Sequence, residues 1–589
     1  MGLIPGRCPG AALVLFVAGA GAAAAQVDTV PRDTTARDTT RRDTAAVNLP
    51  VFPPAPVPGP LAAGMRYVFD TDSLRFSNVY TLSDLLGHVP GVYVARGGFF
   101  GQAEYVLYAG RGAAGLEVFW DGVPYLPMGR DSVVLDPARI PLAAVARVEV
   151  LPLPGVLRVY LVSRRHASTH AHSAVGFLQG DRDMARYMVS FAVRGRPGSG
   201  LTLVYDHRDL NGAQGTSSPG FADDEIWVHA EYTPTPRLGV SYQILSSSWQ
   251  RDPEVDLVDR WTFKRRDGVL RFFAAPNGTV TGPRFQVALA TTSIQGDSAV
   301  PDRSSYQILF DAAHVWGRAR ASATVRLAER PRPFDMEGRI SWSPRRWVTL
   351  GGEARHSRYW DGRPGRRAMA FGGIELPQGL SIRGEMAWAN DLQAPLLATD
   401  RLQETLDVAW AVRWERRWIT LEVGGGRRDG FLPGSAPQGL KTIDGFGPTP
   451  RSDYTRVAGA IRPVPWLSVA GWYFHPWDGG GDFEPPHHAR VSATFFSRFA
   501  RTFPSGVFAL RGAVAAESWS TGARGGRTGD STNLFIGATF VDYDLQVQIG
   551  DVTIFWVMRN GNAMRSSYVP GLGYPKYWQY YGARWEFRN

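Results

Sequence analysis

The chain has 589 residues, with 64 Lys and Arg against 54 Asp and Glu, so its formal net charge is +10. Mean hydropathy is slightly negative, and no internal stretch approaches the roughly 18–20 consecutive apolar residues of a membrane-spanning helix, which argues against a helical membrane bundle. The positive charge is dispersed and not clustered, which argues against nucleic-acid binding. Sequence motifs of hydrolases, metalloproteases and phosphate-binding loops are absent, so we expect no enzyme, no cofactor and no catalytic residue.

The amino terminus predicts export from the cytoplasm. Arg7 is followed by an apolar run, Ala11 to Ala25, that ends in small residues. A run of this length is too short to span a bilayer and is typical of a cleaved signal peptide, which we place at residues 1–25. Cys8 is the only cysteine and lies inside it, so the mature chain would have no disulfide and no cysteine-ligated metal.

Residues 26–64 are expected to form a disordered periplasmic tether. They contain Arg-Asp-Thr three times, at 32–34, 37–39 and 42–44, and then a proline-rich piece from Pro50 to Pro60. Few of these residues can bury apolar surface, and such a segment gains too little from folding to become ordered.

The sequence pattern of residues 65–165 predicts a small α+β domain. The segment 82–88 is expected to form a short helix, because Thr81 or Ser83 can cap its start and Pro90-Gly91 ends it. Asp121-Gly122 is a signal for a hairpin turn. Strands are expected at 92–94, 105–112, 116–125, 140–152 and 157–163.

From residue 170 onward the chain reads as about twenty-two short strands of alternating polarity. In the segment 380–388, one face carries Leu380, Ile382, Gly384, Met386 and Trp388, and the other carries Ser381, Arg383, Glu385 and Ala387. Strand side chains point alternately to opposite faces, so each segment has one apolar and one polar side. The strands are too many for one soluble sandwich, and Trp and Tyr lie near their ends. This predicts a mainly β protein: a transmembrane antiparallel barrel over residues 170–589, with lipid outside, a polar lumen and aromatic belts at both interfaces.

The expected strand cores follow from this alternation. They are 172–180, 185–194, 200–208, 225–233, 237–248, 266–274, 283–294, 305–316, 320–329, 334–343, 347–358, 366–375, 380–390, 403–413, 417–427, 453–462, 466–475, 488–498, 507–517, 533–546, 550–560 and 577–588. Tight turns such as 377–379 alternate with longer connections such as 428–452. Outer-membrane barrels have short periplasmic turns and longer outer loops, so the longer connections are expected outside the cell.

Several charged residues fall on the lumen side of these strands. We expect them to pair with one another or with the domain inside the barrel. They are Glu353, Arg355, Arg383, Glu385, Asp407, Arg413 and Glu422.

The domain at 65–165 resembles the plug domain of TonB-dependent outer-membrane receptors. The resemblance is carried by TLSDLLGHVPGVYV (81–94), an arginine–glycine step, VFWDGVPY (118–125) and IPLAAVARVEVLP (140–152), in this order and spacing. Val552 to Phe587 is similar to the last two strands and last surface loop of that family, while the middle of the barrel matches in architecture only. The resemblance implies a plug inside the lumen, a location in the outer membrane of a Gram-negative-type bacterium, a plug and tether that face the periplasm, and a TonB-type energy-transducing complex as partner.

Three features depart from the family's pattern. Only Pro152-Leu153-Pro154-Gly155 separates two plug strands where the family has a glycine-rich loop and a further strand. The motif that TonB grasps is not clear, and Gln26 to Val30 and Val47 to Phe52 are the candidates. Phe587 is followed by Arg588 and Asn589, whereas an aromatic residue usually ends such chains. The first two departures leave open whether transport is active.

If a ligand binds, its site is expected between the plug apices and the outer loops, because a barrel of this width has a plugged lumen. Aromatic and charged residues are the candidates, and the alternative is that they are ordinary loop residues. They are Arg96, Phe99, Phe100, Phe431, Phe446, Trp477, Asp478, Asp482, His487 and His488.

Two histidine groups could suggest a metal, namely His166, His170 and His172, and His487-His488 with Asp482 and Glu484. A metal site needs converging ligands and an outer shell of partners that orients them. The first group lies on a connecting segment where two of its members share a face only if the chain is extended. We therefore predict no metal site.

The sequence thus favours a TonB-dependent receptor that imports a scarce ligand, such as a siderophore, cobalamin or glycan. Outer-membrane lipid and a TonB-type complex would be its partners, and the barrel would be monomeric. Two alternatives stay open: a plugged barrel that no longer transports and acts as a surface receptor or structural protein, and a passive channel. The sequence does not identify the ligand.

Overall fold

The computed structural model describes residues 48–76, 79–96, 104–126, 135–211, 220–252, 261–278, 281–296, 302–392, 401–433, 447–477, 480–482, 484–522, 536–569 and 574–588. The chain divides into residues 1–46 and residues 47–589, and only the second unit contains described residues. The predicted signal peptide therefore lies outside them. No helix in the described ranges has the length and apolar character needed to cross a membrane.

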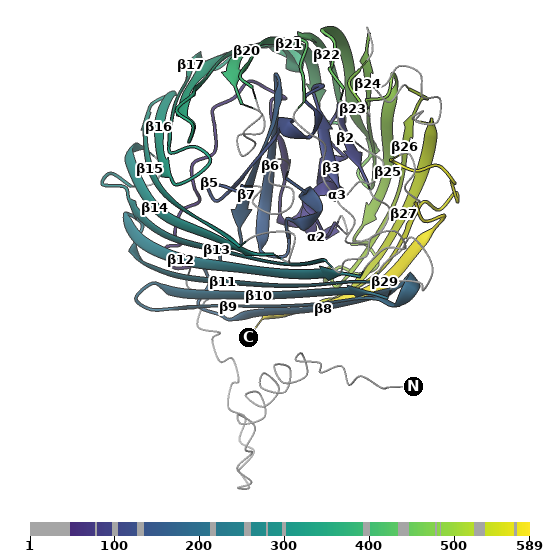
Figure 1. Ribbon diagram of the computed structural model, residues 1–589. Coiled ribbons are helices and arrows are strands. Elements are labelled where there is room, and N and C mark those ends of the chain that lie inside the picture. The colour runs from purple at the N-terminus through teal and green to yellow at the C-terminus, as the bar shows by residue number, and fades with distance from the viewer. Residues whose placement is uncertain are drawn as a thin grey trace, which may run out of the picture. The chain divides into compact units, whose positions relative to one another are not determined.

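The second unit contains a closed antiparallel barrel, seen as a ring of strands in Figure 1. In the described part of the chain its twenty-two strands are β8 His172–Gly180, β9 Met184–Gly195, β10 Ser199–Leu210, β11 Phe221–Thr235, β12 Leu238–Arg251, β13 Trp261–Ala274, β14 Gly282–Gln295, β15 Arg303–Trp316, β16 Ala319–Ala328, β17 Phe334–Arg345, β18 Val348–Arg358, β19 Pro364–Leu376, β20 Leu380–Asp391, β21 Gln403–Arg416, β22 Ile419–Arg428, β23 Ser452–Val464, β24 Leu467–Pro476, β25 His488–Ser497, β26 Phe508–Trp519, β27 Ala538–Ile549, β28 Val552–Arg559 and β29 Trp578–Arg588. Each strand pairs with its sequence neighbours, and β29 pairs with β8 to close the ring.

This arrangement confirms the predicted barrel. Every expected strand core overlaps one of these strands, with ends that differ by up to five residues, and the expected residues 533–535 lie outside the described residues. β13 begins at Trp261, five residues before the expected 266, because its ladder with β12 continues to the Arg251–Trp261 pair. The extra residues include Lys264 and Arg265, whose charges hide the alternation on which the sequence prediction depends.

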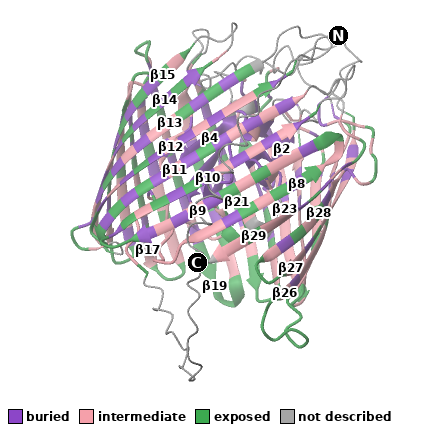
Figure 2. Ribbon diagram, turned by 90° about the horizontal axis from the view of Figure 1, so that it is seen from below, coloured by how far each residue is buried: buried purple, intermediate pink, exposed green. Residues whose placement is uncertain are grey.

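The two faces of the strands divide as the alternation predicts. On β20, Ile382 is 46% exposed and Met386 is 49% exposed, whereas the intervening Arg383 and Glu385 are 4% exposed. Figure 2 shows the same alternation of buried and exposed residues along β11 to β14. The exposed apolar side chains face outward, where lipid would cover them, and the charges face the lumen.

Short and long connections alternate around the ring, and we call its two ends the turn end and the loop end. β9 and β10 are joined at the turn end by residues 196–198, whereas β22 and β23 are joined at the loop end by residues 429–451. Exposed tryptophans lie at or beside the turns, as expected for an aromatic belt. They are Trp316, Trp342, Trp347, Trp418 and Trp466. Trp578 differs, because it is buried against Val557 and Tyr580.

A separate α+β plug lies inside the ring (Figure 1). Its elements are β1 Tyr67–Phe69, α2 Thr71–Phe76, α3 Leu82–Leu86, β2 Val92–Ala95, β3 Tyr105–Tyr108, the 3-10 helices η1 Gly112–Gly115 and η2 Pro137–Arg139, β4 Leu116–Trp120, β5 Val123–Pro124, β6 Val145–Leu153 and β7 Val156–Ser163. One sheet has the order β1-β6-β7-β4-β5, with β4 parallel to β7, and β2 pairs with β3. The predicted helix and the Asp121-Gly122 hairpin are present, whereas β1 and α2 were not predicted because they have only three and six residues, too few to show a periodic pattern.

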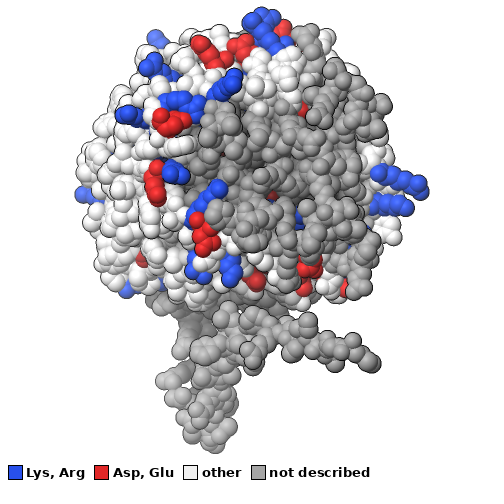
Figure 3. Space-filling model, in the orientation of Figure 1, with Lys and Arg blue, Asp and Glu red and all other residues white. Residues whose placement is uncertain are grey.

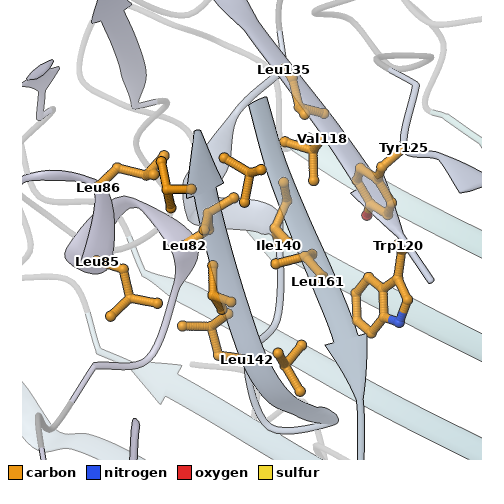
Figure 4. Packing of buried hydrophobic residues seen from close by; sticks show 14 of the residues in the cluster. Leu82, Leu85, Leu86, Val118, Trp120, Tyr125, Leu135, Ile140, Leu142 and Leu161 are labelled. Atoms are coloured by element: carbon orange, nitrogen blue, oxygen red, sulfur yellow. The ribbon is translucent and has the colours of Figure 1, made fainter. Parts of the chain in front are cut away.

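The plug has its own apolar core. α3 begins after Thr81, whose backbone N–H donates to the Asp84 carboxylate (3.4 Å), and it buries Leu82, Leu85 and Leu86. These leucines pack with residues of β4, β7 and the segment before β6, among them Val118, Ile140, Leu142 and Leu161 (Figure 4). Burial of each leucine contributes roughly 1.5–3 kcal/mol, so the short helix is stabilised by packing and not by its length.

Residues 48–65, which we call the strap, correct the prediction of a disordered tether over 26–64. Residues 26–47 lie outside the described residues, but the strap is ordered against the barrel wall and the plug. Phe52 is fully buried and packs edge-on against Phe273 of β13 (ring centroids 5.9 Å apart). Further along, Ala62 and Met65 are buried with Phe371 of β19. The prolines hold the backbone extended and remove N–H groups that would need partners, so a few apolar side chains suffice to dock the segment.

Candidate functional site

Ion pairs join the plug to the barrel wall. Arg158 of β7 is fully buried and donates to Glu353 of β18 (2.7 Å) and to Glu117 of β4 (2.8 Å). Arg355 of β18 donates to Glu117 as well (3.1 Å), and Arg111 pairs with Asp407 of β21.

The remaining lumen charges pair within the wall. Arg383 donates to Glu385 (3.0 Å) and Glu422 (2.8 Å), and Arg413 donates to Glu415 (2.7 Å). The prediction that the lumen charges pair with one another or with the plug is therefore confirmed.

One plug–barrel pair is completely sealed from solvent. Asp121, at the β4–β5 turn, accepts from Arg271 of β13 (2.9 Å), and neither side chain is exposed. Burial would raise the pKa of Asp121, but Arg271, Arg165 and hydrogen bonds from Ser163 hold it below its usual range. Removing one partner of such a pair leaves a buried charge uncompensated, so this contact fixes the plug in position.

The strap is attached at both of its ends. The backbone N–H of Phe52 donates to Glu231 of β11 (3.0 Å), and Arg194 of β9 donates to the carbonyl of Pro50 and pairs with Glu231. At the other end, Arg383 donates to the carbonyl of Ala63 (2.8 Å). These contacts lie in the lumen, where a chain that leads from the amino terminus to the plug must pass.

The predicted ligand residues that the structure describes do not all line one cavity. Four of them, Phe99, Phe100, Phe446 and Asp478, lie outside the described residues. Arg96 pairs with Asp84 inside the plug (3.1 Å), and Phe431 is buried under the Arg111 guanidinium (4.6 Å to the ring centroid). The first contact lies within the plug, and the second joins the plug to the wall.

The predicted residues of β24, β25 and the loop between them divide between two sides of the wall. His488 is 2% exposed and bonds Glu517 (3.0 Å), and Asp482 accepts from the Gly447 N–H (2.8 Å). Both line a cavity of only about 20 Å³, which has room for little more than one water molecule. His487 is instead exposed and stacks on His475 (centroids 4.6 Å apart), and Trp477 is 63% exposed.

The two histidine groups do not form a metal-ligand set. His166 Nε2 is bonded to the backbone carbonyl of His170 (2.6 Å), and the rings of His166 and His172 are 6.4 Å apart. Within the described ranges no three His, Cys, Asp or Glu side chains gather as ligands would.

A cavity at the loop end, which we call the loop-end cavity, lies between the plug and β15 to β21. Its volume is about 170 Å³. The plug contributes β4, β5 and the β6–β7 turn, and the wall contributes a dense set of arginines. They are Arg326, Arg330, Arg332, Arg355 and Arg367, with Arg111 from the plug.

Sequence reasoning missed most of this cavity. Two short signals were present, Arg330-Pro331-Arg332 and Arg366-Arg367, each beside a short connection at the loop end. Figure 3 shows that basic and acidic side chains lie beside one another on the described part of the face seen there.

A second cavity, of about 380 Å³, lies near the turn end between the plug and the β29–β8–β9 wall. Its polar lining includes Arg164, Arg165, His166, His172, Arg186 and Glu586. Arg186 is neutralised by Asp206 of β10 through two hydrogen bonds (2.6 and 2.7 Å). The two cavities therefore lie on either side of the plug core.

A closed β-barrel whose lumen holds a separate α+β domain is the architecture of plugged outer-membrane barrels. Residues 62–157 match the family model of the TonB-dependent receptor plug domain. These residues are therefore a TonB-dependent receptor plug, and the whole described chain has the fold of TonB-dependent receptors.

Solved structures share this fold across nearly the whole chain. The siderophore receptor PirA from Acinetobacter baumannii superposes with a TM-score of 0.68 at 10% identity, over 90% of this chain and 100% of that one. A mutant of the ferric enterobactin receptor PfeA from Pseudomonas aeruginosa gives 0.67 at 9% identity, over 89% and 98%. The copper transporter OprC gives 0.70 at 12% identity, over 89% and 100%. No curated protein matches the sequence.

Proposed function

We propose that this protein is a TonB-dependent receptor that imports a small ligand across the outer membrane of a Gram-negative-type bacterium. The loop end would face the outside, and the turn end and residues 26–47 would face the periplasm. The plug match at residues 62–157 and the shared fold support this proposal.

The observation that carries it is the docked strap. Residues 48–65 run directly into β1 of the plug, and their described attachments to the wall include the buried Phe52 ring and the hydrogen bonds to Pro50, Phe52 and Ala63. Tension applied at the amino terminus would load these attachments first and the plug sheet next. The sequence contains no nucleotide-binding motif, so a partner would have to supply the energy.

The strap also bears on where that partner would bind. Of the two candidate segments, 47–52 contains Phe52, which is buried in the lumen. A partner could not grasp this segment without first undocking it. We therefore propose that the TonB-type protein binds within residues 26–30.

The test is binding of the mature protein to the periplasmic domain of TonB from the same organism. A variant that lacks residues 26–47 keeps the strap, and a second variant carries a scrambled 26–30 in an otherwise intact tether. Binding by the native chain that both changes abolish would support active import. Binding that survives both changes, or no binding by the native chain, would refute the proposal.

One observation favours the alternative of a plugged barrel that does not transport. The β6–β7 connection consists of Pro154-Gly155 between paired strands, and the plug is fixed by sealed pairs such as Asp121–Arg271. Ligand uptake that is equal in cells with and without TonB would favour this alternative. A passive channel would instead conduct ions in a planar bilayer.

A further inference from the structure

The loop-end cavity carries an excess of positive charge. Among the described residues that line it, six are arginines and four are carboxylates, namely Glu117, Asp335, Asp391 and Asp407. The arginines are not equivalent, because some are neutralised by these carboxylates at hydrogen-bond distance and others are not.

Three of the arginines are paired with carboxylates within the wall or between the wall and the plug. Arg355 donates twice to Asp335 (2.7 and 2.9 Å), and Arg326 donates to the same carboxylate (2.7 Å). Arg111 pairs with Asp407. Each of these three arginines has a carboxylate at hydrogen-bond distance, and a structural role accounts for them.

Arg332 and Arg367 are different. The nearest carboxylate to Arg332 is Asp391, at 3.9 Å, and the nearest to Arg367 is Glu117, at 4.0 Å. Both distances exceed a hydrogen bond. Glu117 is also shared with Arg158 and Arg355, so little of its charge remains for Arg367. The Arg332 Nε is buried with no hydrogen-bond partner among the described residues, although both side chains keep some exposure, 21% and 11%.

Two guanidinium groups that line one cavity with no carboxylate at hydrogen-bond distance among the described residues would bind an anion, since charge-assisted bonds to a carboxylate or phosphate are stronger than neutral ones. Gln307 and Thr405 line the same space and can orient a ligand. The volume of about 170 Å³ is below the roughly 300–1,000 Å³ of sites for drug-sized ligands. The ligand part held there must therefore be compact.

We infer that the loop-end cavity binds a compact anion that carries carboxylate or phosphate groups, held by the guanidinium groups of Arg332 and Arg367. The inference rests on the proposed import function and deepens it by naming the class of ligand. The turn-end cavity on the other side of the plug core has a related character. There, Arg164 lines the space, and the buried Nε of its side chain has no hydrogen-bond partner among the described residues.

The test is calorimetric titration of the full mature protein in lipid nanodiscs with citrate and with pyrophosphate, and with glucose as a neutral compound. Variants are Arg332→Gln, Arg367→Gln and their combination. Arg366→Gln is the matched control, because Arg366 is the adjacent arginine on β19 and is exposed on the outward face. Arg367→Lys keeps the charge, and equal thermal unfolding of all variants establishes that they are folded.

The expected result is binding of at least one of the two anions but not of glucose. Each Gln variant should bind that anion roughly ten- to hundredfold more weakly, while Arg366→Gln should match the native protein and Arg367→Lys should lose less than Arg367→Gln. Absence of binding by both anions, equal binding of glucose, or an equal loss in Arg366→Gln would overturn the inference. Because this titration needs no TonB, its failure is distinct from failure of the TonB-binding test.

Discussion

Removing the Phe52 side chain should release the strap from the lumen. Phe52 is fully buried, with the Phe273 ring at 5.9 Å and the guanidinium groups of Arg165 and Arg271 at 5.9 and 5.7 Å from its centroid. Truncating a buried Phe to Ala costs about 3–5 kcal/mol. Since the side chain belongs to the strap and its pocket to the rest of the protein, this cost falls on docking. The undocked population should therefore rise at least about a hundredfold.

Cysteine labelling can measure this population. The mature chain would have no cysteine, since Cys8 lies in the predicted signal peptide, so Val57→Cys introduces a single thiol in the middle of the strap. Val57 is partly buried against the cluster that contains Phe119 and Leu151. A bulky PEG-maleimide should react slowly with the docked strap. When opening and closing are fast, the labelling rate follows the undocked fraction, so Phe52→Ala should raise this rate at least about a hundredfold.

Phe177→Ala is the matched control for Phe52→Ala. Phe177 lies on the outward face of β8 and is 52% exposed, so the same truncation there should leave labelling of the strap unchanged. Equal rates in the native, Phe52→Ala and Phe177→Ala backgrounds would refute the reasoning. So would labelling at the rate of a free peptide in the native background, because the strap would then not be docked.

Three further predictions concern stability. Asp121→Asn should lower the free energy of unfolding by roughly 3–5 kcal/mol because it leaves Arg271 buried without a partner charge. The same acid-to-amide change at Glu415, which is 58% exposed, should cost no more than about 1 kcal/mol. Equal losses of stability in the two variants, measured by urea unfolding, would contradict this prediction. Burial and nearby arginines lower the pKa of His88 to about 3 in the folded protein, whereas a histidine in the unfolded chain has a pKa of about 6.5. Below pH 6.5 the unfolded state therefore binds more protons than the folded state. Stability should fall as the pH drops from about 6.5 toward 3, by at most about 1.4 kcal/mol per pH unit. His88→Gln should reduce the difference between the urea midpoints of unfolding measured at pH 7 and at pH 5. A difference equal to that of the native protein would count against the prediction. Trp410 lies on the outward face and is 49% exposed. Trp410→Arg places a charge there and should destabilise the barrel in bilayers by roughly 2–4 kcal/mol. A loss of stability no larger than that of Trp410→Phe would show that this face does not contact lipid.

The barrel could be predicted from sequence because its signal is local. Each strand carries its own alternation, and neighbouring strands pair in chain order, so no long-range information is needed. The same parity bears on two of the predicted ligand residues. His487 and His488 are adjacent, and the strand that begins at His488 sends the first outward and the second into the lumen. Two adjacent residues of an extended chain point to opposite faces and cannot line one cavity, although their adjacency in the sequence suggested a shared site.

The strap and the loop-end cavity could not be predicted, because their partners are distant in the chain. The Phe52 N–H meets Glu231 across 179 positions, and Arg158 meets Glu353 across 195. Composition alone assigned the proline-rich strap to disorder, since the apolar pocket that receives Phe52 exists only after the wall has closed. The excess of arginine at the cavity likewise depends on which carboxylates the plug brings to it.

The seam between β29 and β8 has a consequence for the order of assembly. It pairs Arg588 with His172 and Phe587 with Ser173, so the last residues of the chain complete the first strand. The other neighbouring strands are joined by connections of 2 to 23 residues, whereas this pair must bring together the ends of a segment of about 400 residues. By loop-closure entropy alone the seam is roughly 2.5–5 kcal/mol less favourable to form than the hairpins between the other strands. It is therefore expected to close last, after the whole polypeptide has been delivered.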